Sequence, residues 1–181
     1  MINLEHLSLG YSRYAQRLLQ AQPCLKEILD VAFTLAWTAE AMETRCQILC
    51  EQQGVTTGLR LLRAEVILRL MERDLRGLAD LAEVTETMTL LAEITVKKAL
   101  AWHTIQMRER YGLPLNAQGM VQDLLVVGMG KLGGRELNVS SDIDLIYLYE
   151  EEGMTTGSET SAPISHQEFF DRLAKQLTQC L

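Results

Sequence analysis

The spacing of hydrophobic residues predicts helix for nearly all of residues 1–112. Apolar positions recur at steps of three and four, which is the signature of one buried helix face. Pro23 suits a first helical turn, and the helix that follows it is expected to run to about Gln53, where Gly54 breaks it. Thr56 or Thr57 would cap the next helix. Its expected apolar face comprises Leu59, Leu62, Val66, Leu70 and Leu78, with Arg60, Arg63, Arg69, Arg73 and Arg76 mainly off that stripe.

A third helix is predicted over residues 81–110, and the pattern then changes. Residues 116–122 read as a polar loop, 124–127 as a buried strand, and 143–149 as a second strand after a glycine-rich turn. Ser165 and Glu168 form the capping box of a last helix. The apolar face of that helix is Phe169, Phe170, Leu173, Leu177 and Leu181.

The chain is therefore expected to be α+β, with a helical lead-in over residues 1–115 and a smaller α/β part over 116–181. Two strands alone make a marginal sheet, and the last helix needs more to pack against. We expect the sequence to be a fragment of a longer protein.

Composition narrows the class of partner. The chain has 181 residues, is 48% hydrophobic and carries a net charge of −7, which argues against nucleic acid. No signal peptide is visible in Met1–Gly10, and no apolar run reaches the roughly 20 residues that would cross a membrane, so we expect a cytoplasmic protein. Cys46 and Cys50 share a helix face, but with only three histidines in the chain we expect buried thiols rather than a metal site.

The glycine-rich turn allows three interpretations. Gly128, Gly130 and Gly133 satisfy the dinucleotide-binding pattern, but only the eight residues 134–141 precede the next strand, too few for a crossover helix. A P-loop is disfavoured as well, because Leu132 occupies the position of its Ser or Thr and residue 125 is not glycine. The third interpretation is a nucleotidyltransferase site.

That third interpretation rests on Asp142 and Asp144. Residues i and i+2 of a strand point to the same side, so the two carboxylates would project together, away from Ile143. Adjacent carboxylates repel unless a cation lies between them, and their oxygens suit Mg²⁺ or Mn²⁺. The pair Gly133-Gly134 is expected to open a short helix whose N–H groups bind phosphate. A metal ion bound next to a phosphate site is the arrangement that nucleotidyl transfer requires.

The stretch from Gly128 to Asn138, followed by Ser140-Ser141-Asp142-Ile143-Asp144-Leu145-Ile146, closely resembles the signature of glutamine synthetase adenylyltransferase, also called glutamate–ammonia-ligase adenylyltransferase. Upstream and downstream segments are similar too, so the resemblance covers about residues 55–181. It implies a polymerase-beta-like nucleotidyltransferase fold. The early position of the motif and its Glu136-Leu137-Asn138 stretch favour the amino-terminal half of the family, which removes AMP from glutamine synthetase with phosphate and releases ADP.

Carried over to this sequence, the resemblance implies that Asp142 and Asp144 are catalytic metal ligands for Mg²⁺, with Mn²⁺ as a substitute. Gly133, Gly134 and Ser141 would line the phosphates of the nucleotide. Lys131 and Arg135 are candidate charge partners of phosphate, and each could equally be a solvated surface residue.

Enzymes of this fold use a third carboxylate on a later strand. The available acids, Glu150, Glu151, Glu152, Glu168 and Asp171, fall on the end of the same strand or on the last helix, so none of them fits. We therefore expect the third carboxylate beyond Leu181 and a fragment that is inactive alone.

Two alternatives stay open. The chain could belong to the half that transfers AMP from ATP, or it could be a non-catalytic module that binds glutamine synthetase or the PII signal protein. The partners that the resemblance implies are glutamine synthetase, PII, phosphate and the nucleotides ADP, ATP and AMP. Neither nucleic acid nor a membrane is expected as a partner.

Overall fold

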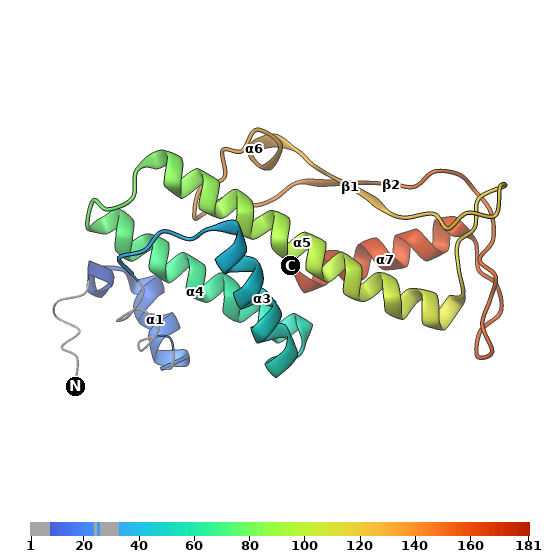
Figure 1. Cartoon of the computed structure of the whole chain (residues 1–181), viewed down its shortest axis with the longest axis horizontal. Helices are drawn as coiled ribbons and strands as arrows, with labels where there is room; N and C mark the ends of the chain where they lie inside the picture. The colour runs from blue at the N-terminus through green and yellow to red at the C-terminus, as the bar shows by residue number, and fades with distance from the viewer. Residues whose placement is uncertain (1–7, 24, 26–32) are drawn as a thin grey trace. The chain divides into compact units, whose positions relative to one another are not determined.

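The computed structural model describes residues 8–23, 25 and 33–181 (Figure 1). Contacts divide the chain into two compact units. The first, here called the helical unit, comprises Met1–Ile94 with Gly134–Asp142; the second, the sheet unit, comprises Thr95–Gly133 with Ile143–Leu181. The division falls within the long helix α5 (Leu81–Tyr111), which therefore contributes residues to both.

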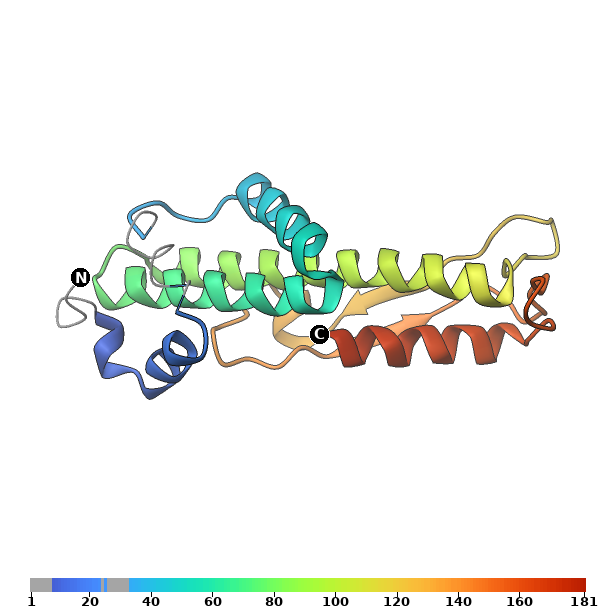
Figure 2. The same cartoon turned by 90° about the horizontal axis from the view of Figure 1, so that it is seen from below.

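The helical unit is built around α4. Its elements are the 3-10 helix η2 (Ser8–Tyr11), α1 (Arg13–Ala21), α3 (Ala39–Gln53), α4 (Val55–Leu75) and the first part of α5. Figures 1 and 2 show α4 running alongside the beginning of α5. Four of the five residues predicted for the apolar face of α4 are buried, namely Leu59, Leu62, Val66 and Leu70. The prediction was wrong for Leu78, which is 49% exposed because α4 ends three residues earlier.

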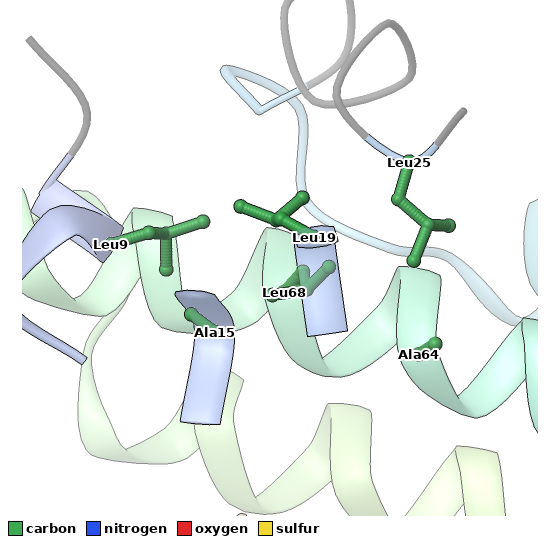
Figure 3. Close-up of a cluster of buried hydrophobic side chains, with 6 residues drawn as sticks. All are labelled: Leu9, Ala15, Leu19, Leu25, Ala64 and Leu68. Carbon is green, nitrogen blue, oxygen red and sulfur yellow. The ribbon is translucent and has the colours of Figure 1, made fainter. Parts of the chain in front are cut away.

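One buried cluster joins η2 and α1 to α4 (Figure 3). All of its side chains are aliphatic, and removing such side chains from water helps to stabilise the junction. The cluster consists of Leu9, Ala15, Leu19, Leu25, Ala64 and Leu68. The hydroxyl of Ser12 caps α1 by accepting a hydrogen bond from the Ala15 N–H at 3.2 Å.

Helices α3 and α4 approach each other closely at Gly58. A Cβ atom at this position would stand 2.7 Å from the backbone nitrogen of Cys50, so no larger residue fits without moving α3. The Sγ atoms of Cys46 and Cys50 lie 4.0 Å apart, and both thiols are buried and form no disulfide within the described part of the chain. The prediction of buried thiols is confirmed for these two and for Cys180, while Cys24 lies outside the described residues.

Buried acidic groups of α4 are matched by cations. Glu65, 4% exposed, pairs with Arg45 at 2.6 Å. Glu72 is fully buried, accepts a hydrogen bond from the Leu9 N–H at 3.2 Å and pairs with Arg76. Burying a carboxylate is costly unless it is paired and hydrogen-bonded, and both glutamates meet that condition.

Arg73 forms a second buried connection on α4. Its guanidinium donates two hydrogen bonds to Glu83, at 2.6 and 2.9 Å. It also donates to the backbone carbonyls of Phe33, Thr34 and Leu78, at 3.1, 2.7 and 3.2 Å. One side chain therefore ties α4 to the start of α5 and to the segment before α3.

These contacts explain why the first long helix was predicted wrongly. Residues 33–38 are not helical, and α3 begins only at Ala39, where the Thr38 hydroxyl accepts from the Ala41 N–H at 3.1 Å. The carbonyl of Leu35 accepts a hydrogen bond from Arg69, as others nearby do from Arg73, so side chains replace the bonds of a helix. The part of the prediction that concerns residues 24 and 26–32 lies outside the described residues.

The expected threonine cap of the next helix is also wrong. Helix α4 begins at Val55, and Gly54 takes the capping position without a side-chain hydrogen bond. Gly54 has φ 79°, which glycine adopts freely and other residues resist. The capping position is therefore two residues before Thr56 and three before Thr57, and both threonines lie inside the helix.

The sheet unit has two layers. Strands β1 (Leu125–Gly128) and β2 (Leu145–Leu148) pair antiparallel, with Leu125 opposite Leu148 and Gly128 opposite Leu145. The end of α5 and the last helix, α7 (His166–Cys180), lie on one side of this sheet (Figure 1). The core between them contains Met107, Tyr111, Leu124, Phe169, Phe170 and Leu173.

Local signals predicted this unit well. Helix α5 starts and ends within one residue of the expected bounds, and the Ser165 hydroxyl caps α7 by accepting from the Glu168 N–H at 3.1 Å. Both strands exist, although β1 is shifted by one residue and β2 is shorter than expected; the prediction of a buried first strand was wrong, because β1 is exposed or half-buried along its length. The structure is compatible with the α+β class, while the domain boundary expected at residue 115 stays a prediction. Within the described part of the chain, no helix is long and apolar enough to cross a membrane.

Candidate functional site

The glycine-rich turn connects β1 to the short helix α6 (Gly130–Gly133). A Cβ at Gly128 would stand 2.7 Å from the Leu132 side chain, and a Cβ at Gly133 would stand 2.7 Å from the Gly128 carbonyl oxygen. Two of the three glycines of the motif are therefore required by close packing within the turn. Leu132 fills the space between them as an apolar plug, a different role from the hydroxyl that a P-loop needs at this place.

The pair Gly133-Gly134 closes α6 instead of opening a helix, so that expectation was wrong. The amides of Leu132 and Gly133 both donate to the Met129 carbonyl, at 3.1 and 3.2 Å, which places Gly133 in the last part of the turn. Arg135 follows with φ 56°, a left-handed conformation that ends helices. A helix C-terminus presents carbonyls and not N–H groups, so phosphate binding at these two glycines has no support from a helix start and stays a prediction.

Asp144 lies beside this turn in the sheet unit. Its carbonyl accepts a hydrogen bond from the Met129 N–H at 2.8 Å, one step beyond the β1–β2 ladder. One carboxylate oxygen of Asp144 is 3.6 Å from the place where a Cβ at Gly130 would stand. The backbone of the turn and this acidic side chain are therefore neighbours, as the motif predicts, although Asp144 immediately precedes β2 and was expected within the strand.

Exposure alternates through this segment. Asp142 and Asp144 are exposed, whereas Ile143 and Leu145 are partly buried, which is the alternation that the sequence pattern predicts. Asp142 ends the part of the chain assigned to the helical unit. Among the described residues, neither carboxylate has an ion pair or a side-chain hydrogen bond. Both acids are thus available to a cation from solution.

The described residues contain no group of three or more His, Cys, Asp or Glu side chains that would hold a metal by themselves. Two of the acids excluded by the sequence pattern are engaged elsewhere, because Glu168 pairs with Arg172 and Asp171 pairs with Lys175. Glu152 accepts a hydrogen bond from the Tyr149 hydroxyl, and that bond raises the pKa of the tyrosine. A metal here would have two carboxylates from this chain and would take its other ligands from elsewhere.

Asn138 and Ser141 form a compact turn directly before Asp142. The Asn138 side-chain oxygen accepts hydrogen bonds from the Ser140 amide at 3.1 Å and from the Ser141 hydroxyl at 2.9 Å. The Asn138 amide in turn donates to the Ser141 hydroxyl oxygen at 3.2 Å. Ser141, predicted to line a phosphate, is therefore held by a local ring of hydrogen bonds, and its predicted role has not been tested.

Arg135, a candidate partner of phosphate, has its guanidinium against two carboxylates of α5, and a role with phosphate stays a prediction. Nη2 lies 2.7 Å from Glu86, and Nη1 lies 2.8 Å from Glu93. The hydrogen bond to Glu86 and the charge of Glu93 raise the pKa of Arg135. Lys131 is exposed on α6, and its role stays a prediction.

Comparison with known proteins decides the family. A model of the family described as glutamate-ammonia ligase adenylyltransferase matches residues 4–181. The chain belongs to this family.

Individual relatives agree. The bifunctional glutamine synthetase adenylyltransferase/adenylyl-removing enzyme of Aromatoleum aromaticum is 47% identical over 171 residues, covering 94% of this chain and 18% of the relative. The proteins of the same name from Burkholderia mallei and Ralstonia nicotianae are 47% and 45% identical, covering 94% and 96% of this chain and 19% of each relative. The chain thus spans about one fifth of the length of the relatives that it matches.

The sequence pattern did not identify Glu86 and Glu93, the two residues that pair with Arg135. Glu86 and Glu93 lie 49 and 42 positions away from it. Nothing local marks them, since both read as solvated positions of a helix. Only their separation of seven residues, two helical turns on one face, could have indicated a shared partner.

Proposed function

We propose that this chain is the adenylyl-removing part of a glutamine synthetase adenylyltransferase. The reaction would be phosphorolysis of an adenylyl-tyrosine on glutamine synthetase. An oxygen of inorganic phosphate forms a bond to the adenylyl phosphorus, the bond to the tyrosine oxygen breaks, and the products are ADP and the free tyrosine side chain. Membership of the family supports the substrate, and the names of the relatives include this activity.

The observation that carries the proposal is the pair of acids Asp142 and Asp144. Both are exposed, they are two residues apart, and neither is neutralised by a cation within the described part of the chain. Two like charges so close in sequence raise the cost of placing them there, unless a cation compensates. The stretch from Asp142 to Asp171 contains no lysine or arginine, so the sequence that follows the pair supplies no nearby compensating cation.

The donor set fits Mg²⁺. This ion prefers oxygen ligands, keeps several waters, and is commonly held by one or two carboxylates together with the phosphates of a substrate. Asp142 and Asp144 would therefore hold Mg²⁺ or Mn²⁺, whose charge would stabilise the negative oxygens around the reacting phosphorus. A set of three protein carboxylates is not needed in the described residues for this mode of binding.

The residues of the chain would contribute mainly by position. The turn around Gly130 places backbone next to the Asp144 carboxylate, where the absence of side chains leaves room for a phosphate group. Gly133, Gly134 and Ser141 would line the nucleotide, with Lys131 as a charge partner. In phosphoryl transfer, positioning and electrostatic stabilisation supply most of the catalysis.

The test is a chimera in which this chain replaces the matching 171 residues of the Aromatoleum aromaticum relative. Two activities are measured on the same protein: release of ADP from adenylylated glutamine synthetase with phosphate and Mg²⁺, and incorporation of AMP from ATP. Asp142→Asn is compared with the unsubstituted chimera, and circular dichroism establishes that both are folded. The unaltered relative is the positive control.

We expect Asp142→Asn to lower ADP release by at least about a hundredfold, the order of loss for a group that stabilises transition-state charge, and to leave AMP incorporation unchanged. The reverse result would assign the chain to the AMP-transferring half. If both activities survived in the folded variant, the aspartates would not be catalytic. The chain would then be better described as a module that binds glutamine synthetase or PII.

A further inference from the structure

We propose that Arg135 is a positioning residue for Asp142 and not a ligand of phosphate. This inference rests on the proposed function, because it gives Asp142 the role of a metal ligand. The residues involved all belong to the helical unit, which contains both Gly134–Asp142 and the first part of α5.

The first observation is conformational. Arg135 is the only non-glycine residue with positive φ in the described part of the chain. A side chain in this region costs of order 1 kcal/mol, and such residues persist when their surroundings hold them there. Glycine would remove the cost, so the presence of arginine indicates that its side chain contributes something that glycine cannot.

The second observation shows what holds it. Glu86 and Glu93 stand seven residues apart on α5, and the guanidinium bridges them with one nitrogen on each carboxylate, at 2.7 and 2.8 Å. A lysine would offer a single point charge, whereas the planar fork of arginine reaches two partners at once. The bridge fixes the chain at the point where it leaves α6.

The third observation connects this bridge to Asp142. Two residues after Arg135, Leu137 is buried to 2% exposure. The hydrogen-bonded turn of Asn138 with Ser141 follows, and Asp142 is the next residue. The segment therefore has an ionic anchor, an apolar anchor and a closed turn in succession, which leaves the backbone of Asp142 few alternatives.

A role in phosphate binding is harder to reconcile with these contacts. Both terminal nitrogens of Arg135 already contact carboxylates, and an anion would have to displace them. The two roles also predict opposite results, which makes them separable by substitution.

The experiment measures Mn²⁺ binding to this 181-residue chain by electron paramagnetic resonance, which reports the concentration of free Mn²⁺. The variants are Arg135→Gln, the double variant Glu86→Gln/Glu93→Gln, and the triple variant that combines them. Arg63→Gln, at an exposed arginine of α4, is the control for loss of one positive charge.

If Arg135 positions Asp142, Arg135→Gln weakens Mn²⁺ binding by about threefold to tenfold, the range expected when exposed ion pairs are lost. Simple electrostatics predicts the opposite, because removing a positive charge favours a bound cation. The triple variant should bind no more weakly than Arg135→Gln alone, since all three substitutions break one bridge. Unchanged or tighter binding in Arg135→Gln would overturn the proposal.

Binding of inorganic phosphate in the presence of Mn²⁺ distinguishes the competing role. A phosphate ligand at Arg135 would make phosphate binding fall in Arg135→Gln and persist in Glu86→Gln/Glu93→Gln. A positioning residue would make the two variants behave alike. Arg135→Lys should recover part of the Mn²⁺ affinity, because an ammonium can still pair with one of the two glutamates.

The proposed function can fail separately. If Mn²⁺ binding by the wild-type chain is absent or is unaffected by Asp142→Asn, the metal assignment is wrong. Amide hydrogen exchange then still decides whether Arg135 holds the segment. The Ser141 amide, which donates to the Asn138 carbonyl at 3.1 Å, should exchange faster in Arg135→Gln than in the wild type. Equal rates would show that the bridge does not restrain this segment.

Discussion

Two acidic side chains of helix α4 differ in burial and in ion pairing from those of Asp142 and Asp144. On α4 the carboxylates of Glu65 and Glu72 are buried, and each is paired with an arginine. The two aspartates are exposed and have no such partner among the described residues. The buried glutamates stabilise the fold through their ion pairs, whereas the exposed aspartates are available to a ligand. Only the aspartates can bind a cation without first losing a structural contact.

The largest effect should come from breaking the buried side of this comparison. We expect Arg73→Leu to lower the free energy of unfolding by about 3–5 kcal/mol, because it leaves Glu83 and several backbone carbonyls without their donor. Urea denaturation measures the change. Arg63→Leu, at an exposed position of the same helix, is the matched control and should stay within about 0.5 kcal/mol of the wild type. Equal effects at both positions would mean that the network around Arg73 is not structural.

The exposed side should respond to cations instead. In EDTA, we expect Asp142→Asn/Asp144→Asn to change the free energy of unfolding by less than about 0.5 kcal/mol, since no contact is lost. Mg²⁺ or Mn²⁺ should stabilise the wild type, by about 2.7 kcal/mol at a hundred times its dissociation constant, and should leave the double variant unchanged. Thermal unfolding with and without the ion is the measurement. Equal stabilisation of both proteins would place the cation elsewhere.

The smallest effect concerns His103, a partly buried group with no ion pair among the described residues. Burial lowers the pKa of His103 on α5, and its contact with Gln176 offsets this only in part. The pKa of His103 in the folded chain lies below the value of about 6.5 in the unfolded chain. The free energy of unfolding should therefore be unaffected by this group above pH 6.5. It should fall slightly as the pH drops through the lower pKa. Unfolding at pH 7.5, 6.5 and 5.5 should show this slope in the wild type and a flatter one in His103→Gln.

Local signals in the sequence predicted much of the fold. The Ser165 cap, the end of α5 near Gly112 and the apolar face of α7 all depend on residues within one or two helical turns. Residues 33–38 were predicted wrongly because Arg69 and Arg73, more than 30 positions away, bind their carbonyls. A prediction from local sequence spacing contains no information about partners so far away along the chain.

The candidate site shows the same limit. The acidic pair and the tight glycine turn follow from the motif, and the alternating exposure agrees with it. The direction of α6 was wrong, because Gly133-Gly134 also suits the end of a helix and glycine alone does not distinguish the two ends. The partners of Arg135 were missed, since they lie on a helix more than 40 residues earlier.

The buried cysteines can serve as built-in probes of how often each unit opens. Cys46 and Cys50 are enclosed in the helical unit, and Cys180 is enclosed in the sheet unit. A thiol reagent can modify them only when the surrounding structure opens, so the rate of modification reports the frequency of opening. Peptide mapping would separate the three thiols from Cys24. The opening rate of each unit could then be measured separately, in the unaltered protein and without an introduced label.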